Sequence, residues 1–70
     1  MVSWQDAIVK VMEGRHGPVK LRDLYDAVLR VKKTDLDEKS IKHRVRAALN
    51  DLRKEGRVEN VAEGLWELNR

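Results

Sequence analysis

The chain has no cysteine and no phenylalanine, and a single proline and four glycines among its 70 residues. Without cysteine it can form neither a disulfide framework nor a thiolate metal site, and it has no thiol nucleophile. The absence of cysteine is compatible with a cytoplasmic location. We expect the protein in the cytoplasm, where it could associate with the nucleoid.

Long apolar runs are also absent. No stretch of about eighteen apolar residues occurs, so the sequence predicts no membrane-spanning helix and no membrane partner. Residues 1–3 lead directly into an amphipathic pattern rather than into the basic and then apolar segments of a secretory signal. We expect residues 1–70 to form one small domain that buries about 60% of its unfolded surface, too little for an enclosed catalytic cavity.

Charge is abundant and unevenly distributed. Residues 30–57 hold ten Lys and Arg against five Asp and Glu, and the rest of the chain holds five against seven. The net charge is therefore +5 for residues 30–57 and −2 for the rest of the chain. Such a concentration of positive charge is typical of a nucleic-acid-binding surface, but small helical domains also carry Lys and Arg for solubility. Charge alone leaves both interpretations open.

The strongest pattern predicts a helix over residues 38–55. Asp37 can cap its start, and Gly56 can supply a left-handed stop at its end. The apolar residues recur three, four and seven positions apart and share one helix face: Ile41, Val45, Ala48, Leu49 and Leu52. The opposite face is basic and amide-bearing, and its residues are Lys39, His43, Arg46, Ala47 and Asn50. Lys42 and Arg53 lie on one shoulder of this face.

The remaining patterns predict an α+β fold in the order α-β-α-α-β-β. Helical spacing occurs over residues 4–13 and 21–30, and residues 19–20 are extended between them. Residues 57–68 suit a hairpin whose tight turn is Glu63-Gly64, and residues 19–20 can add a third antiparallel strand. Three aromatic residues could stack on nucleobases, but each lies in the apolar register of its element, so we assign them to the core: Trp4, Tyr25 and Trp66.

Two sets of residues resemble known families. The recognition helix of GntR-type bacterial repressors has the pattern V-R-x-A-L-x-x-L-x-x-E-G, which resembles residues 45–56, Val45-Arg46-Ala47-Ala48-Leu49-Asn50-Asp51-Leu52-Arg53-Lys54-Glu55-Gly56. HARE-type winged helices and the N-terminal domain of Mrr-type restriction proteins resemble the two ends, Trp4-Gln5-Asp6-Ala7-Ile8 and Gly64-Leu65-Trp66-Glu67-Leu68. Over nearly its whole length, the chain is similar to winged helix-turn-helix domains. This resemblance implies a winged-helix fold, double-stranded DNA as partner and a role in transcription regulation.

In these families the equivalent of residues 37–55 enters the major groove, which implies that five residues approach DNA: Lys39, Lys42, His43, Arg46 and Asn50. Arg46 matches the arginine of the repressor pattern. Arg can bond two acceptors of guanine and Asn can pair similarly with adenine, whereas Lys and His mainly contact phosphates or single acceptors. Arg30, Lys32 and Lys33 form a basic connector that leads to this helix. Their charges could complement the dipole of the helix that they end, but we favour contact with DNA phosphates, with Lys20 or Arg22 as further contacts.

The predicted hairpin departs from the family. DNA-binding wings usually carry Lys or Arg, whereas residues 58–67 contain Glu59, Glu63 and Glu67 and no basic residue. Carboxylates repel phosphates, so we expect the hairpin not to grip the DNA backbone. The alternative function is a protein-interaction module that uses the acidic hairpin for docking.

An enzyme is the least favoured class. His16 and His43 each stand alone, without metal-ligand spacing and without a nearby carboxylate motif, so we predict no catalytic residue, metal or cofactor. We expect Arg44 to pair with Asp51 or Glu55 on its own helix. A single short helix binds DNA weakly, so we also expect a homodimer or a protein partner, although no heptad seam specifies one.

Overall fold

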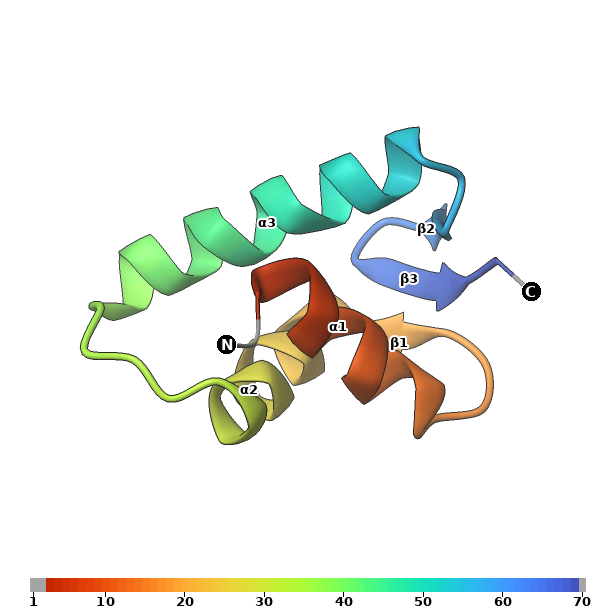
Figure 1. Cartoon of the computed structure of the whole chain (residues 1–70). Helices are drawn as coiled ribbons and strands as arrows, with labels where there is room; N and C mark the ends of the chain where they lie inside the picture. Colours follow the sequence, from red (N-terminus) through yellow and green to blue (C-terminus); the bar gives the residue numbers. More distant parts are fainter. Residues whose placement is uncertain (1–2, 70) are drawn as a thin grey trace.

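A computed structural model describes residues 3–69 as three helices and a three-stranded antiparallel sheet, an α+β arrangement compatible with a winged-helix layout (Figure 1). The order α-β-α-α-β-β is the one that the sequence predicts. The observed helix ends lie within one residue of the expected ones. The elements are α1 (Trp4–Glu13), β1 (Val19–Lys20), α2 (Leu21–Val31), α3 (Glu38–Lys54), β2 (Val58–Ala62) and β3 (Leu65–Leu68).

The sheet lies at the C-terminal end of α3, and its strand order is β1-β3-β2 (Figure 1). Val19 is opposite Trp66 in one ladder, and Val58 is opposite Leu68 in the other. The turn between β2 and β3 contains Gly64 at φ +73°, a left-handed conformation that favours glycine. The backbone N–H of Leu21, the first residue of α2, donates to the Gly64 carbonyl at 2.8 Å, so the turn is tied to the start of α2.

The end of α3 is closed by two backbone hydrogen bonds. Gly56 adopts φ +76°, its N–H donates to the Arg53 carbonyl at 3.0 Å, and the Arg57 N–H donates to the Leu52 carbonyl at 2.9 Å. This pair of bonds is the Schellman motif, which satisfies carbonyls that a helix end leaves without partners. The left-handed stop expected at Gly56 is confirmed, and it turns the chain directly into β2.

The core lies where the three helices meet the inner side of the sheet. Each of its largest fully buried side chains stabilises the fold by about 1.5–3 kcal/mol by leaving water. These side chains come from four elements and are Ile8, Leu24, Val28, Val45, Leu49, Leu52 and Val58. Trp4, Tyr25 and Trp66 are half-buried and pack against this core, as expected. No helix within residues 3–69 combines the length and the apolar character needed to cross a bilayer.

Candidate nucleic-acid interface

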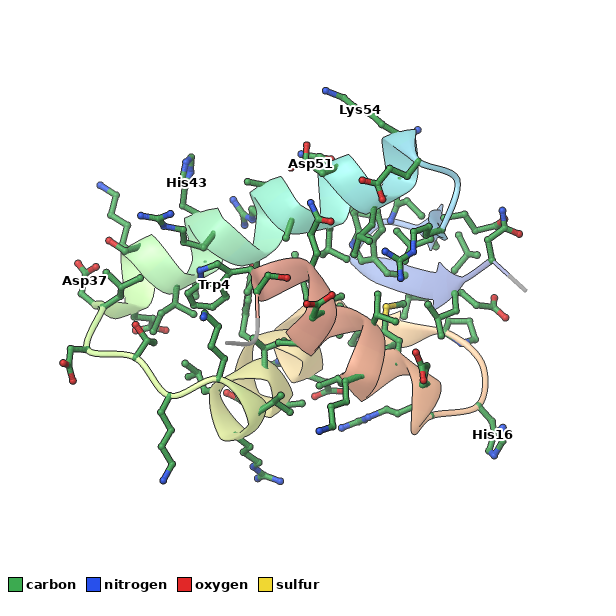
Figure 2. The ribbon with its side chains drawn as sticks, in the orientation of Figure 1. Trp4, His16, Asp37, His43, Asp51 and Lys54 are labelled. Carbon is green, nitrogen blue, oxygen red and sulfur yellow. The ribbon has the colours of Figure 1, made fainter. Side chains whose placement is uncertain are left out.

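The outward side of α3 carries most of the residues that the sequence singles out for DNA. Lys39, His43, Arg46 and Asn50 are exposed, and Lys42 is half-buried. His43 and Lys54 point away from the body of the molecule (Figure 2). The other side of α3 buries the five apolar residues of the predicted face: Ile41, Val45, Ala48, Leu49 and Leu52. The helix therefore separates a core face from a basic face, as its spacing predicts.

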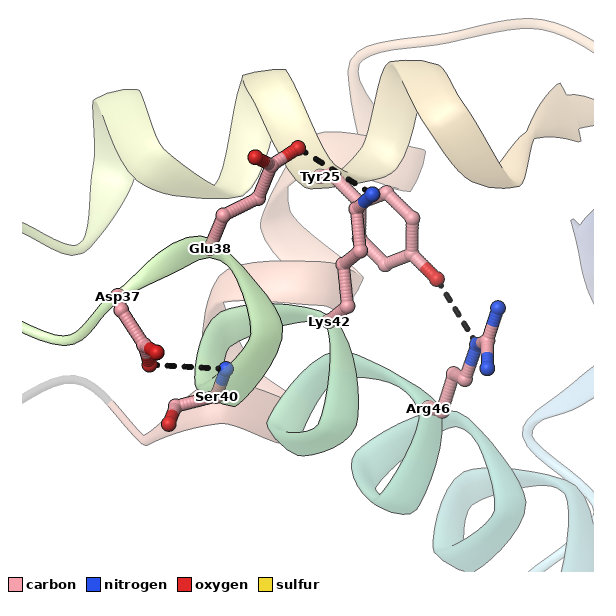
Figure 3. A network of polar contacts seen from close by, with 6 residues as sticks. All are labelled: Tyr25, Asp37, Glu38, Ser40, Lys42 and Arg46. Carbon is pink, nitrogen blue, oxygen red and sulfur yellow. Dashed lines mark hydrogen bonds and ion pairs between the residues drawn. The ribbon is translucent and has the colours of Figure 1, made fainter.

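One shoulder of this basic face is held against α2 by Tyr25. The Arg46 Nε–H donates to the Tyr25 hydroxyl at 3.0 Å, and the Lys42 ammonium lies 5.8 Å from the centre of the Tyr25 ring (Figure 3). The Lys42 ammonium also pairs with Glu38 at 3.2 Å, one turn earlier on α3. These contacts limit the positions that the two basic side chains can take.

The Tyr25 hydroxyl was not anticipated, because the sequence assigns the whole residue to the core. A usable signal was present: a tyrosine in an apolar register carries a hydroxyl that needs a polar partner or water. Tyr25 is half-buried, with its ring against the core and its hydroxyl on Arg46. It therefore belongs both to the core and to the basic face.

The start of α3 is capped as predicted. The Asp37 carboxylate accepts a hydrogen bond from the Ser40 backbone N–H at 3.1 Å (Figure 3). Hydrogen bonding from Ser40, through its side chain and its backbone N–H, lowers the pKa of the Asp37 carboxyl below its ordinary value. The ionised carboxylate thus stabilises the helix start both as a hydrogen-bond acceptor and as a negative charge at the positive end of the helix dipole.

The basic connector is not brought together with Arg46. Lys32 directly follows α2 as its C-cap residue, and its ammonium lies 5.4 Å from the centre of the Trp4 ring. Trp4 borders a shallow hollow with Arg44 and Asp51, on the shoulder of α3 that faces α1. Lys32 is therefore held beside the shoulder opposite to Tyr25. Two further basic residues of this region are exposed: Arg30 in the last turn of α2 and Lys33 in the following loop.

Between α3 and the β2–β3 hairpin lies an open hollow. Its lining combines residues of α2, α3 and the hairpin: Leu21, Arg46, Asn50, Asn60, Glu63, Gly64 and Trp66. Arg46 and Asn50, the two residues best suited to base recognition, thus border the hairpin as well as the outward side of α3. A ligand on α3 that extended toward this hollow would meet the carboxylate of Glu63.

Asn60 shapes this hollow by closing an irregularity in β2. Its side-chain amide donates to the Ala62 carbonyl at 2.7 Å and to the Leu65 carbonyl at 2.8 Å. The register shifts between Asn60 and Ala62, which leaves Val61 as the extra residue of a β-bulge. Asn60 was not among the residues expected to matter, although an asparagine three residues before a Glu-Gly turn commonly bonds nearby backbone groups.

The hairpin itself is acidic, as its sequence predicts. Glu59 is directly opposite Glu67 in the β2–β3 ladder, and Glu63 stands in the exposed turn. Like charges directly across a ladder repel each other. Arg57, at the base of the hairpin, pairs with Glu55 at 3.9 Å, so its charge is partly offset.

The pairing expected for Arg44 is wrong. Within residues 3–69 no ion pair involves Arg44, and Glu55 pairs with Arg57 instead. Asp51 is about two helical turns from Arg44, and Glu55 about three, too far for the one-turn pairs that stabilise helix surfaces. Arg44 remains an exposed positive charge on the shoulder that faces α1.

The two histidines lie far apart. His16 is in the turn after α1 and His43 is on α3, at opposite corners of the molecule (Figure 2). Among the described residues, no three His, Cys, Asp or Glu side chains gather in a way that could hold a metal ion.

Comparison with known proteins adds no identity to this geometry. No protein-family model, curated protein or solved structure matches the chain. The resemblance to winged helix-turn-helix domains therefore stays a prediction.

Proposed function

We propose that this protein is a non-enzymatic winged-helix DNA-binding protein of transcription regulation that acts in the cytoplasm on the nucleoid, with α3 as its recognition helix. One observation carries the proposal: α3 buries its apolar side in the core and presents a row of basic and amide side chains outward. The row recurs with helical spacing along the exposed side: Lys39, His43, Arg46 and Asn50.

The dimensions of α3 suit the major groove. Its 17 residues span about 25 Å at about 1.5 Å per residue. A major groove is about 12 Å wide and admits one α-helix. With α3 in the groove, Arg46 and Asn50 would lie at its middle, near base edges. Lys39 and Arg53 lie toward its two ends, where the phosphates of the groove walls are closest.

The charges of α3 and its flanks supply the attraction. Each Lys or Arg that neutralises a phosphate releases a counterion, so affinity should fall steeply with salt. The acidic hairpin opposes this attraction, because Glu59, Glu63 and Glu67 would lie near the phosphates if it followed the groove. We therefore expect the hairpin to stay off the DNA backbone. A homodimer or a partner protein would then supply the additional contacts that a specific site requires.

A second function is favoured by the same acidic hairpin. Two carboxylates, Glu59 and Glu67, are held directly opposite each other, and Glu63 lies in the turn beside them. A basic segment of a partner protein would relieve this repulsion. If the hairpin is a docking surface, reversing the charges of Glu59 and Glu63 together should abolish capture of the partner, and unchanged capture would exclude this use of the hairpin.

Binding to a random-sequence duplex at low and moderate salt tests the main proposal. Lys39→Gln removes one charge from the outward side of α3, and Lys10→Gln removes the same charge from the exposed last turn of α1. We expect Lys39→Gln to lower the slope of log affinity against log salt by about 0.9, as one lost phosphate contact would. Lys10→Gln should leave that slope unchanged. No salt-sensitive binding by the unmodified protein would refute the proposal.

A further inference from the structure

Tyr25 contacts the guanidinium of Arg46 in a way that leaves its far end open. The 3.0 Å hydrogen bond from Arg46 uses Nε, the nitrogen nearest the aliphatic stem (Figure 3). Within residues 3–69, no other hydrogen bond or ion pair involves the Arg46 side chain. The two terminal amino groups, Nη1 and Nη2, therefore remain available as a pair of donors.

That pair of donors matches one base. Guanine presents two acceptors, N7 and O6, at its major-groove edge, and an arginine can bond both at once through its two terminal amino groups. With Nε engaged by Tyr25, the side-on approach that uses Nε and one terminal amino group is blocked. The end-on approach is the one left to Arg46.

The surroundings of Tyr25 favour a fixed position. Its ring packs against the core, and the Lys42 ammonium lies over it at 5.8 Å from the ring centre. Lys42 is itself held by Glu38 at 3.2 Å. Because Tyr25 belongs to α2 and Arg46 to α3, the packing of the two helices sets the place of the guanidinium before any ligand arrives.

We infer that Tyr25 is a positioning residue for sequence selection: it holds Arg46 so that Nη1 and Nη2 read a guanine in the major groove. This inference rests on the proposed DNA-binding function and adds to it a base and a residue outside the recognition helix. Ordering a long side chain at an interface lowers affinity by about two- to tenfold, and Tyr25 removes that loss in advance.

The test uses Tyr25→Phe, which keeps the ring and every charge and removes the hydrogen-bond acceptor. Duplexes selected from a random pool by the unmodified protein identify the guanine whose replacement weakens binding, and Arg46→Ala shows whether that preference depends on Arg46. We expect Tyr25→Phe to lower the preference for that guanine about two- to tenfold. The slope of log affinity against log salt should stay the same, because no charge is lost.

A second measurement is made on the free, unmodified protein, so that it does not depend on whether the variant folds. Side-chain 15N relaxation of the Arg46 Nε–H group should show an ordered group, in contrast to that of Arg44 on the opposite shoulder. An Arg46 Nε–H group as mobile as that of Arg44 would overturn the inference.

The outcomes separate this inference from the proposed function. If the unmodified protein binds no duplex DNA, the function fails and the inference fails with it. If it binds with an Arg46-dependent guanine preference that Tyr25→Phe leaves intact, the inference alone is overturned. Salt-sensitive binding without any guanine preference also overturns the inference and leaves the proposed function standing.

Discussion

Helix α3 and the β2–β3 hairpin meet at Gly56 but are built in different ways. α3 buries five side chains in the core, whereas in the hairpin Val58 is fully buried and the four residues of β3 are half-buried. α3 is basic on its outward side, and the hairpin is acidic. The helix is thus anchored firmly by one face and free to present the other, while the hairpin forms a thinner layer. This difference in burial and charge supports the proposal that α3, and not the hairpin, is the binding element.

The largest expected effect tests the difference in anchoring. Leu49→Ala removes a fully buried side chain of α3 and should cost about 2–5 kcal/mol, from a total that is about 4–10 kcal/mol for a chain of this size. Leu68→Ala removes a half-buried side chain of β3 and should cost about 1 kcal/mol. Urea unfolding followed by circular dichroism measures both. Equal losses would contradict the stronger anchoring of α3.

The junction between the two regions is tested by Gly56→Ala. At φ +76° an alanine is strained, and no neighbouring atom lies close enough to clash with the added methyl group, so the cost of about 1–2 kcal/mol comes from the backbone alone. Gly14→Ala is the matched control, because Gly14 ends α1 at φ −79°, which alanine adopts freely. Thermal unfolding should show a clear loss for the first variant and little or none for the second. The same loss in both would speak against the left-handed stop.

The acidic character of the hairpin is tested by Glu59→Lys. The new lysine would face Glu67, replacing repulsion with attraction, and should raise stability by about 0.5–1 kcal/mol. Glu63→Lys makes the same charge change in the turn, without a residue opposite it in the ladder, and should raise stability less. Both variants should bind duplex DNA more tightly at low salt if the hairpin lies near phosphates. If both variants gained the same stability, the gain would come from the change in net charge and not from the position of Glu59 opposite Glu67.

The smallest effect concerns the start of α3. Because the folded pKa of Asp37 is lowered, its contribution to stability is fully present above the ordinary pKa and is lost as pH falls through the lowered one. That window lies below about pH 4. Asp37→Asn keeps a capping oxygen and does not titrate, so its stability should fall less between neutral pH and about pH 3. Urea midpoints at the two pH values measure this loss of stability. The same loss in the unmodified protein and in Asp37→Asn would show that Asp37 does not contribute to the loss of stability in acid.

The sequence predicts α3 well because its signals are local. The spacing of the apolar residues, the cap at Asp37 and the glycine at its end each depend on neighbours within a turn or two. The same local signals predict the two shorter helices and the Glu63-Gly64 turn. Local patterns also placed the basic residues on the outward side of α3.

Contacts between elements could not be predicted in this way. Tyr25 and Arg46 are 21 residues apart, and their hydrogen bond depends on how α2 crosses α3. The position of Lys32 over Trp4 depends in the same way on how α1 and α2 pack. Glu59 lies opposite Glu67 because of the register of the β2–β3 ladder, and this register shifts at the bulge at Val61. Spacing along one helix also suggested a partner for Arg44 that the distances do not allow.

We propose that α3, and not the hairpin, contacts DNA. Backbone amide NMR spectra recorded while a random-sequence duplex is added, at low and at moderate salt, test it most directly. We expect shifts concentrated at the backbone amides of Lys39, His43, Arg46 and Asn50 that weaken as salt rises, with little change at Glu59 and Val61. Shifts centred on the hairpin, or none at low salt, would contradict it.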